Sequence, residues 1–117
     1  MLYMTKLYNL EYLEEISAGD KEFIADMLHD FVTQTPVTLS DIETQINKAE
    51  WYELYKIIHK FIPSFEFVGA ENIRAELRVV EQYAKTGTDV EKIAPIINNV
   101  KGFCFNVIDE LKTDFNL

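Results

Sequence analysis

The chain has 117 residues, 48% of them apolar and 13% aromatic, which fills the core of one domain and is too short for two. Eleven Lys and Arg against twenty Asp and Glu leave a net charge of −9, which disfavours binding to nucleic acid and to anionic membrane surfaces. The single cysteine, Cys104, cannot form an intrachain disulfide, and no segment reaches the ~20 apolar residues of a membrane span or resembles an export signal. These properties predict one cytoplasmic domain over residues 1–117.

The first half of the chain predicts two helices. Four glycines and three prolines provide too few turn signals for a mainly β fold. A short helix from Leu10 to Ile16 is expected to stop at Gly19, its C′ residue, with Asp20 as the N-cap of the next helix. From Asp20, apolar residues recur every three or four positions, which predicts a long helix, kinked or briefly broken at Pro36. Its expected core stripe is Phe23, Met27, Phe31, Leu39, Ile42, Ile46 and Ala49.

Two further helices are predicted in the middle of the chain. The third begins near Glu50 and is interrupted by Pro63. The fourth runs from about Gly69 to Ala84, with Gly87 just beyond its end. The core stripe of the third is Leu54, Ile58, Phe61 and Phe65, and that of the fourth is Ala70, Ile73, Leu77, Val80 and Ala84.

The last predicted helix starts at the capping-box pattern Thr88-Asp89-Val90-Glu91, with Pro95 near its start. Its core stripe is Ile93, Ile97, Val100, Cys104, Val107 and Leu111. Short connections favour antiparallel neighbours. The sequence therefore predicts an all-α fold, an antiparallel up-down four-helix bundle with a short extra N-terminal helix packed across it.

The two histidines differ in their surroundings. His29 follows Asp26 by three residues, but no second pair of this kind exists to complete a metal site, so a solvated side chain is expected. His59 lies off the core stripe of its helix, because each residue advances the helix by ~100°, and its ring is expected to reach solvent. Its neighbours on the same helix face are Tyr52, Tyr55, Lys56, Ile62, Pro63 and Glu66.

The segment from Ile57 to Ala70 resembles the phosphorylation motif of histidine-containing phosphotransfer (HPt) domains, roughly H-x-L-K-G-S-x-x-x-x-G-A. The residues at matching offsets are His59, Phe61, Ser64, Gly69 and Ala70. Upstream, Gly19-Asp20, Phe23-Ile24, Phe31, Pro36 and Leu39 are similar to the preceding helix of that family, so the resemblance covers nearly the whole chain.

The resemblance implies a phosphorelay intermediate. The histidine of such a domain accepts a phosphoryl group from an aspartyl phosphate on a response-regulator receiver domain and passes it to another receiver, with a hybrid sensor histidine kinase upstream. The receiver supplies Mg²⁺ and a lysine, so the chain is expected to need no cofactor of its own and to have no autonomous kinase activity. A monomer is expected.

Two positions depart from the family pattern. The family usually has Lys three residues after the histidine, where this chain has Ile62, and we hypothesise that Lys60 and Lys56 supply the missing charge. Pro63 stands where the family usually has Gly. It is expected to kink the helix and turn Ile62 and Pro63 into an apolar docking ledge. The alternative is that Ile62 joins the core and Pro63 ends the helix.

The remaining site residues receive supporting roles. The expected receiver-docking surface consists of Tyr52, Tyr55, Ile62, Pro63 and Glu66. Ser64 is expected to hydrogen-bond locally, and the small residues Gly69 and Ala70 to let the third and fourth helices approach closely. Arg74 and Arg78 are expected to pair with Glu71 or Glu81 rather than to bind an anion. The alternative function, favoured by the missing lysine, is a non-catalytic module that binds receivers; no metal site or enzyme machinery is expected.

Overall fold

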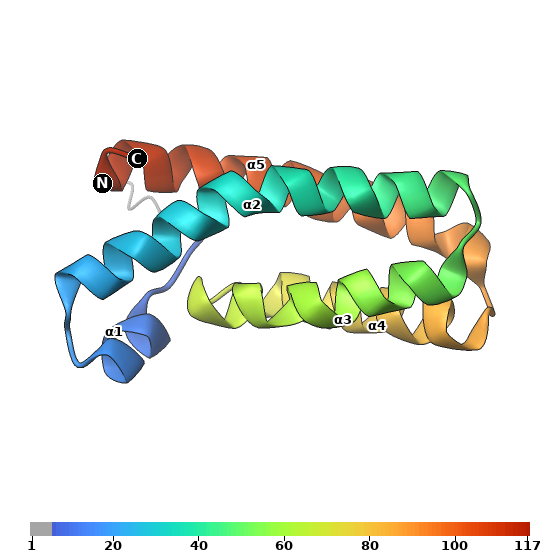
Figure 1. Ribbon diagram of the computed structural model, residues 1–117, viewed down its shortest axis with the longest axis horizontal. Helices are drawn as coiled ribbons and strands as arrows, with labels where there is room; N and C mark the ends of the chain where they lie inside the picture. The colour runs from blue at the N-terminus through green and yellow to red at the C-terminus, as the bar shows by residue number, and fades with distance from the viewer. Residues whose placement is uncertain (1–5) are drawn as a thin grey trace, which may run out of the picture.

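The computed structural model describes residues 6–117, and this part of the chain is helical, with no strand (Figure 1). The helices are α1 (Glu11–Ser17), α2 (Lys21–Asn47), α3 (Trp51–Phe67), α4 (Glu71–Thr86) and α5 (Ile93–Phe115), with a 3-10 turn, η1 (Val90–Lys92), before α5. The predicted all-α class is confirmed. Within residues 6–117, no helix has both the length and the apolar character required to cross a membrane.

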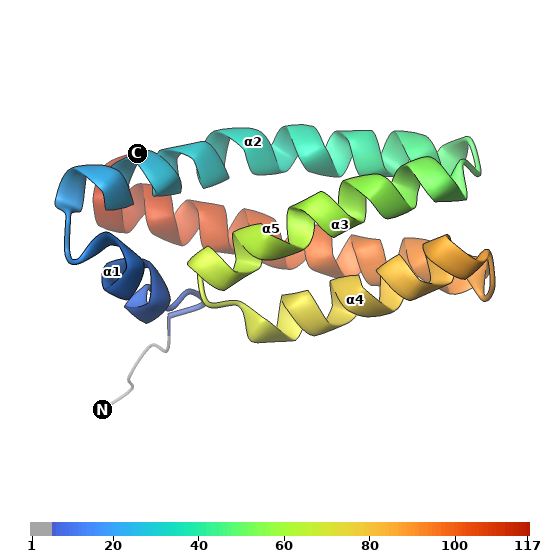
Figure 2. The ribbon, with the colours of Figure 1, turned by 60° about the horizontal axis from the view of Figure 1, so that its bottom comes forward.

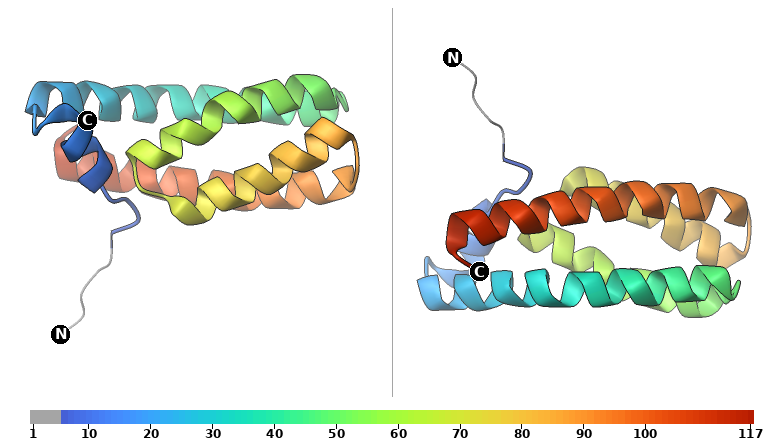
Figure 3. Two further views of the ribbon diagram at one scale, coloured as in Figure 1. Left: turned by 90° about the horizontal axis from the view of Figure 1, so that it is seen from below. Right: turned by 90° about the horizontal axis from the view of Figure 1, so that it is seen from above.

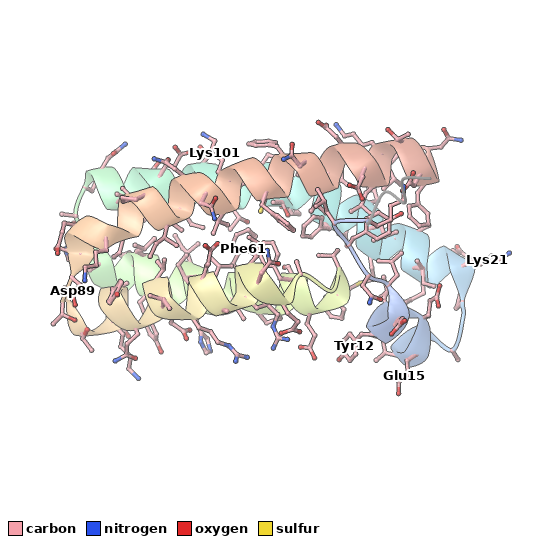
Figure 4. The ribbon with its side chains drawn as sticks, turned by 180° about the vertical axis from the view of Figure 1, so that it is seen from behind. Tyr12, Glu15, Lys21, Phe61, Asp89 and Lys101 are labelled. Carbon is pink, nitrogen blue, oxygen red and sulfur yellow. The ribbon has the colours of Figure 1, made fainter. Side chains whose placement is uncertain are left out.

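The four long helices lie in two layers, α2 beside α5 and α3 beside α4 (Figure 1). Each of them contacts two others, since α2 and α4 each pack against both α3 and α5. The chain turns back on itself at each connection between them (Figures 2 and 3). The short α1 packs against α2 and α3 at one end of the molecule. The core lies between the layers, where the side chain of Phe61 is located (Figure 4).

The predicted core is largely confirmed in the second half of the chain. All residues of the stripes expected for α3, α4 and α5 are buried, and Ile62, Val68 and Ile108 join them. The α2 stripe is partly wrong. Phe23 is 41% exposed and Ala49 lies beyond the helix, whereas Leu28, Val32 and Thr35 are buried. The reason is geometric, because five residues at ~100° each place Phe23 about 140° around the helix from Leu28.

The helix ends match the sequence expectations at some points only. The side chain of Asp20 accepts hydrogen bonds from the backbone N–H groups of Glu22 and Phe23, so the predicted N-cap is confirmed. The predicted capping box at Thr88 is wrong. Asp89 takes a left-handed conformation, and the Thr88 hydroxyl bonds to that of Thr86 instead of a helix N–H. The turn η1 then delays the start of α5 to Ile93.

Neither Pro36 nor Pro63 ends the helix in which it lies. Pro36 lies inside α2 and Pro63 inside α3, and both helices continue beyond them. The predicted interruption at Pro63 is therefore wrong, and of the two outcomes predicted for Pro36, a kink or a brief break, the break does not occur. Each proline removes one backbone N–H donor, and the buried turns on either side keep the helix in place.

The N-terminal segment shows why residue 69 is a glycine, for which the sequence predicted a role in helix packing. The Asn9 N–H donates to the carbonyl of Val68 at 2.8 Å, in the connection between α3 and α4. Gly69 has φ of +68°, and a Cβ there would lie 2.4 Å from the Asn9 carbonyl oxygen. Gly69 is therefore required by the turn and by this contact rather than by the approach of α3 to α4. Ala70 is buried, as its predicted packing role requires.

Candidate functional site

Two contacts define how α3 and α4 face each other. The imidazole Nδ1 of His59 lies 2.6 Å from a carboxylate oxygen of Glu81, and the Lys85 ammonium lies 5.8 Å from the centre of the Tyr55 ring. The step from His59 back to Tyr55 along α3 thus matches the step from Glu81 forward to Lys85 along α4. The two helices are antiparallel in this register, which brings position 62 opposite Arg78.

One ring nitrogen of His59 is hydrogen-bonded, and the other is free. Its side chain is 68% exposed, whereas that of Glu81 is only 23% exposed. A carboxylate can only accept a hydrogen bond, so Nδ1 of the neutral ring carries the proton and Nε2 carries the free lone pair. The expectation that His59 reaches solvent is confirmed. Glu81 therefore fixes the tautomer that leaves Nε2 as a nucleophile.

A shallow depression of about 400 Å³ lies beside His59 on the surface shared by α3 and α4. Its floor includes Ile62, which is only 8% exposed. The predicted apolar ledge is therefore wrong for Ile62, which follows Ile58 by one turn and joins the core. Pro63 and Glu66 line the same depression, and Pro63 is exposed.

The arginines of α4 lie in this depression. Arg74 pairs with Glu71, as predicted, and its Nε is buried without a hydrogen-bond partner in the described part of the chain. Arg78 is exposed and forms no ion pair with any side chain of residues 6–117. The pairing with Glu71 or Glu81 predicted for Arg78 is therefore wrong, and the Glu81 carboxylate instead accepts a hydrogen bond from Nδ1 of His59.

The two lysines expected to assist His59 are placed elsewhere. The Lys56 ammonium pairs with Glu53 at 2.9 Å and lies over the Tyr52 ring, one turn farther from the depression. Lys60 lines a separate hollow on the side of α3 that faces α2, together with Thr38 and Asp41. The arginines, and neither lysine, line the depression beside His59.

An aromatic row leads along α3 to the histidine. The ring centres of Tyr52 and Tyr55 are 6.0 Å apart, and those of Tyr55 and His59 are also 6.0 Å apart. Tyr52 is 65% exposed, and Tyr55 is half-buried beneath Lys85. Both tyrosines therefore lie on the face of α3 that carries His59, as their spacing predicted.

The other predicted residues contribute less to the site. Ser64 lies on the opposite side of α3, among residues of α2, and its hydroxyl makes no hydrogen bond with the chain from residue 6 onward. The local bond predicted for it is therefore absent from the described structure. His29 is exposed, and no cluster of three metal-ligating side chains occurs within residues 6–117.

The charge of the chain is unevenly distributed around this site. Helices α3 and α4 together carry five basic and five acidic side chains, so their charges cancel. The basic residues are Lys56, Lys60, Arg74, Arg78 and Lys85, and the acidic ones are Glu53, Glu66, Glu71, Glu76 and Glu81. The entire formal charge of −9 therefore resides outside these two helices. An anionic partner would meet less repulsion at the His59 face than elsewhere.

Sequence reasoning found His59 and missed Glu81. The histidine is detectable because its helix has a clear apolar stripe, from which the ring is rotated away. Glu81 follows 22 positions later with no local pattern that relates it to the histidine. Only the register of α3 against α4 could have identified it.

No family model matches the chain, and searches of curated proteins and of solved structures find no significant match. Function is therefore inferred from the residues of the site.

Proposed function

We propose that the chain is an HPt-type phosphotransfer protein of a two-component phosphorelay, with His59 as the phosphoryl acceptor. The observation that carries this proposal is the exposed His59 ring, whose Nδ1 is bonded to Glu81 while Nε2 remains open to a partner. The HPt-like residues around it, His59, Phe61, Ser64, Gly69 and Ala70, support the same assignment.

The transfer step uses the free nitrogen of the ring. The Nε2 lone pair attacks the phosphorus of a receiver aspartyl phosphate, and the bond from phosphorus to the aspartate oxygen breaks, so that aspartate leaves as a carboxylate. The imidazole keeps its Nδ1 proton and becomes positively charged. The carboxylate of Glu81, bonded to that proton, stabilises this charge. A carboxylate of the next receiver then attacks the phosphorus and releases the neutral ring.

The proposal includes the fold and the partners. We assign α2 to α5 to an antiparallel up-down four-helix bundle within one domain over residues 1–117, acting as a cytoplasmic monomer. Its partners are receiver domains, which bring Mg²⁺, and a hybrid sensor histidine kinase upstream. The docking surface includes Pro63 and Glu66, which line the depression beside His59, and Tyr52 and Tyr55, which form the aromatic row that leads to it. Helices α3 and α4, which form this surface, have no net charge.

Transfer assays with phosphorylated receivers test the proposal. Each purified receiver of the source organism is phosphorylated and mixed with this protein, and acid-labile phosphate on the protein is measured. Label on the wild type that is lost in His59→Gln and retained in His29→Gln would support His59 as the acceptor. Label retained in His59→Gln would refute it.

A second function is favoured by one observation. Ile62 removes the cation that HPt domains usually carry one turn after the histidine, and its apolar side chain cannot neutralise the charge of a phosphoryl group. A non-catalytic module that binds receivers would tolerate this loss. Measurable binding to a receiver, without label from any receiver in the panel, would favour that function.

A further inference from the structure

We infer that Arg78 of α4 binds the phosphoryl group on Nε2 of His59, and thereby replaces the cation that position 62 of α3 lacks. This inference rests on the proposed function and names the residue that would stabilise its phosphorylated form. It differs from the expectation drawn from the sequence, which gave this role to Lys60 and Lys56.

The register of the two helices provides the first argument. Glu81 faces His59 and Lys85 faces Tyr55. Arg78 precedes Glu81 by three residues, on the same face of α4, and is therefore directed toward the turn of α3 that follows His59. That turn contains Ile62. His59, Ile62 and Arg78 line the same depression, so α4 contributes a cation to the depression that a lysine at position 62 would also have lined.

Competition among the charges of the depression provides the second argument. Arg74 is engaged by Glu71, and Glu81 is bonded to His59. Arg78 is exposed and forms no ion pair with residues 6–117, so its guanidinium can bind a new anion without breaking an existing pair. Glu66 is the remaining acid of the depression and would weaken this attraction without blocking it.

The chemistry of the two groups provides the third argument. A guanidinium presents a planar set of N–H donors that matches two phosphoryl oxygens and remains charged at every working pH. Glu81 balances the charge of the phosphorylated ring, and Arg78 balances that of the phosphoryl oxygens. The burial of Ile62 beneath the depression is compatible with this arrangement, since the cation does not need to come from α3.

Chemical phosphorylation tests the inference without any partner protein. With phosphoramidate as donor, Nε2 attacks the phosphorus, the phosphorus–nitrogen bond breaks, and the donor nitrogen leaves as ammonia. A ³¹P NMR titration then reports the pKa of the phosphoryl group on His59. Arg78→Ala is expected to raise that pKa by about 0.2–0.7 units, because exposed ion pairs contribute roughly 0.2–1 kcal/mol. Arg78→Lys should restore part of the difference.

Two matched variants separate this contact from a general charge effect. Lys112→Ala removes an exposed cation from α5 and should leave the phosphoryl pKa unchanged. Lys60→Ala tests the competing position on α3. A rise in Lys60→Ala with none in Arg78→Ala would overturn the inference, as would equal pKa values in the wild type and Arg78→Ala. Far-UV circular dichroism checks that each variant is folded.

The same experiment distinguishes failure of the inference from failure of the proposed function. If phosphoramidate produces no Nε2-phosphohistidine at position 59, both are refuted. If it does, and the pKa responds to neither arginine variant, only the role of Arg78 is refuted. If Arg78→Ala shifts the pKa while no receiver transfers phosphate, the contact is supported and the relay role is refuted.

Discussion

Replacing Glu81 tests whether the hydrogen bond to Nδ1 controls the reactivity of His59. In Glu81→Ala, the ring loses the acceptor that holds its Nδ1 proton. A charge-assisted hydrogen bond contributes about 1.5–3 kcal/mol in a buried setting, and the 68% exposure of His59 reduces this to about 1 kcal/mol. Phosphoryl transfer should therefore slow by about fivefold. Nitrogen-15 NMR should show the neutral ring shifting from the Nδ1–H toward the Nε2–H tautomer, which free histidine prefers.

The tautomer readout distinguishes positioning from a loss of structure. Glu66→Gln removes a carboxylate that lines the same depression and makes no hydrogen bond to the His59 ring, so this variant should retain the Nδ1–H tautomer. Glu81→Gln keeps an acceptor oxygen but loses the charge, and should fall between the wild type and Glu81→Ala. Equal transfer rates and equal nitrogen-15 shifts in the wild type and Glu81→Ala would refute the role assigned to Glu81.

Two predictions concern the scaffold of the site. Gly69→Ala should lower the free energy of unfolding, measured in urea, by about 1–2 kcal/mol or more, because φ is +68° and the new Cβ would clash with Asn9. Gly102→Ala has open space around the new Cβ and should raise the free energy of unfolding by up to ~1 kcal/mol. Similar values for the two variants would contradict this reasoning. Burial raises the pKa of the Cys104 thiol to about 12, so the folded protein should resist thiol reagents at pH 8. Above pH ~9 only the thiol of the unfolded chain ionises, so the folded state should lose stability there. Rapid labelling of Cys104 in the folded protein would contradict this.

The helices with strong amphipathic patterns could be predicted from the sequence. In α4 and α5, a continuous apolar stripe recurs at helical spacing, and every predicted core residue of both is buried, although Val79 and Phe105 lie outside the stripe and are exposed. In α2, apolar residues occur on more than one face, so the pattern alone could not separate the exposed Phe23 from the buried Leu28. The difference is decided by packing against neighbouring helices, which a single segment does not encode.

The prolines show a second limit of local reasoning. In an isolated helix, an interior proline costs about 3 kcal/mol and would favour a break. In the folded chain, the turns around Pro36 and Pro63 are attached to buried residues on both sides, among them Thr35, Leu39 and Phe65. Separating these turns would expose apolar surface, so the helix continues through the proline.

The site shows the same limit at the level of chemistry. The position of His59 depends on one helix and could be predicted, whereas Glu81 and Arg78 depend on how α4 lies against α3. Ile62 follows Ile58 by four residues and so lies at the edge of the buried stripe, where an apolar side chain gains burial and a lysine would have to extend toward solvent. When the chain is compared with the HPt motif position by position, it lacks a positive charge at position 62. Across the two antiparallel helices, the guanidinium of Arg78 faces the same depression from the other side, so a substitution that removes a cation from one helix need not remove it from the site.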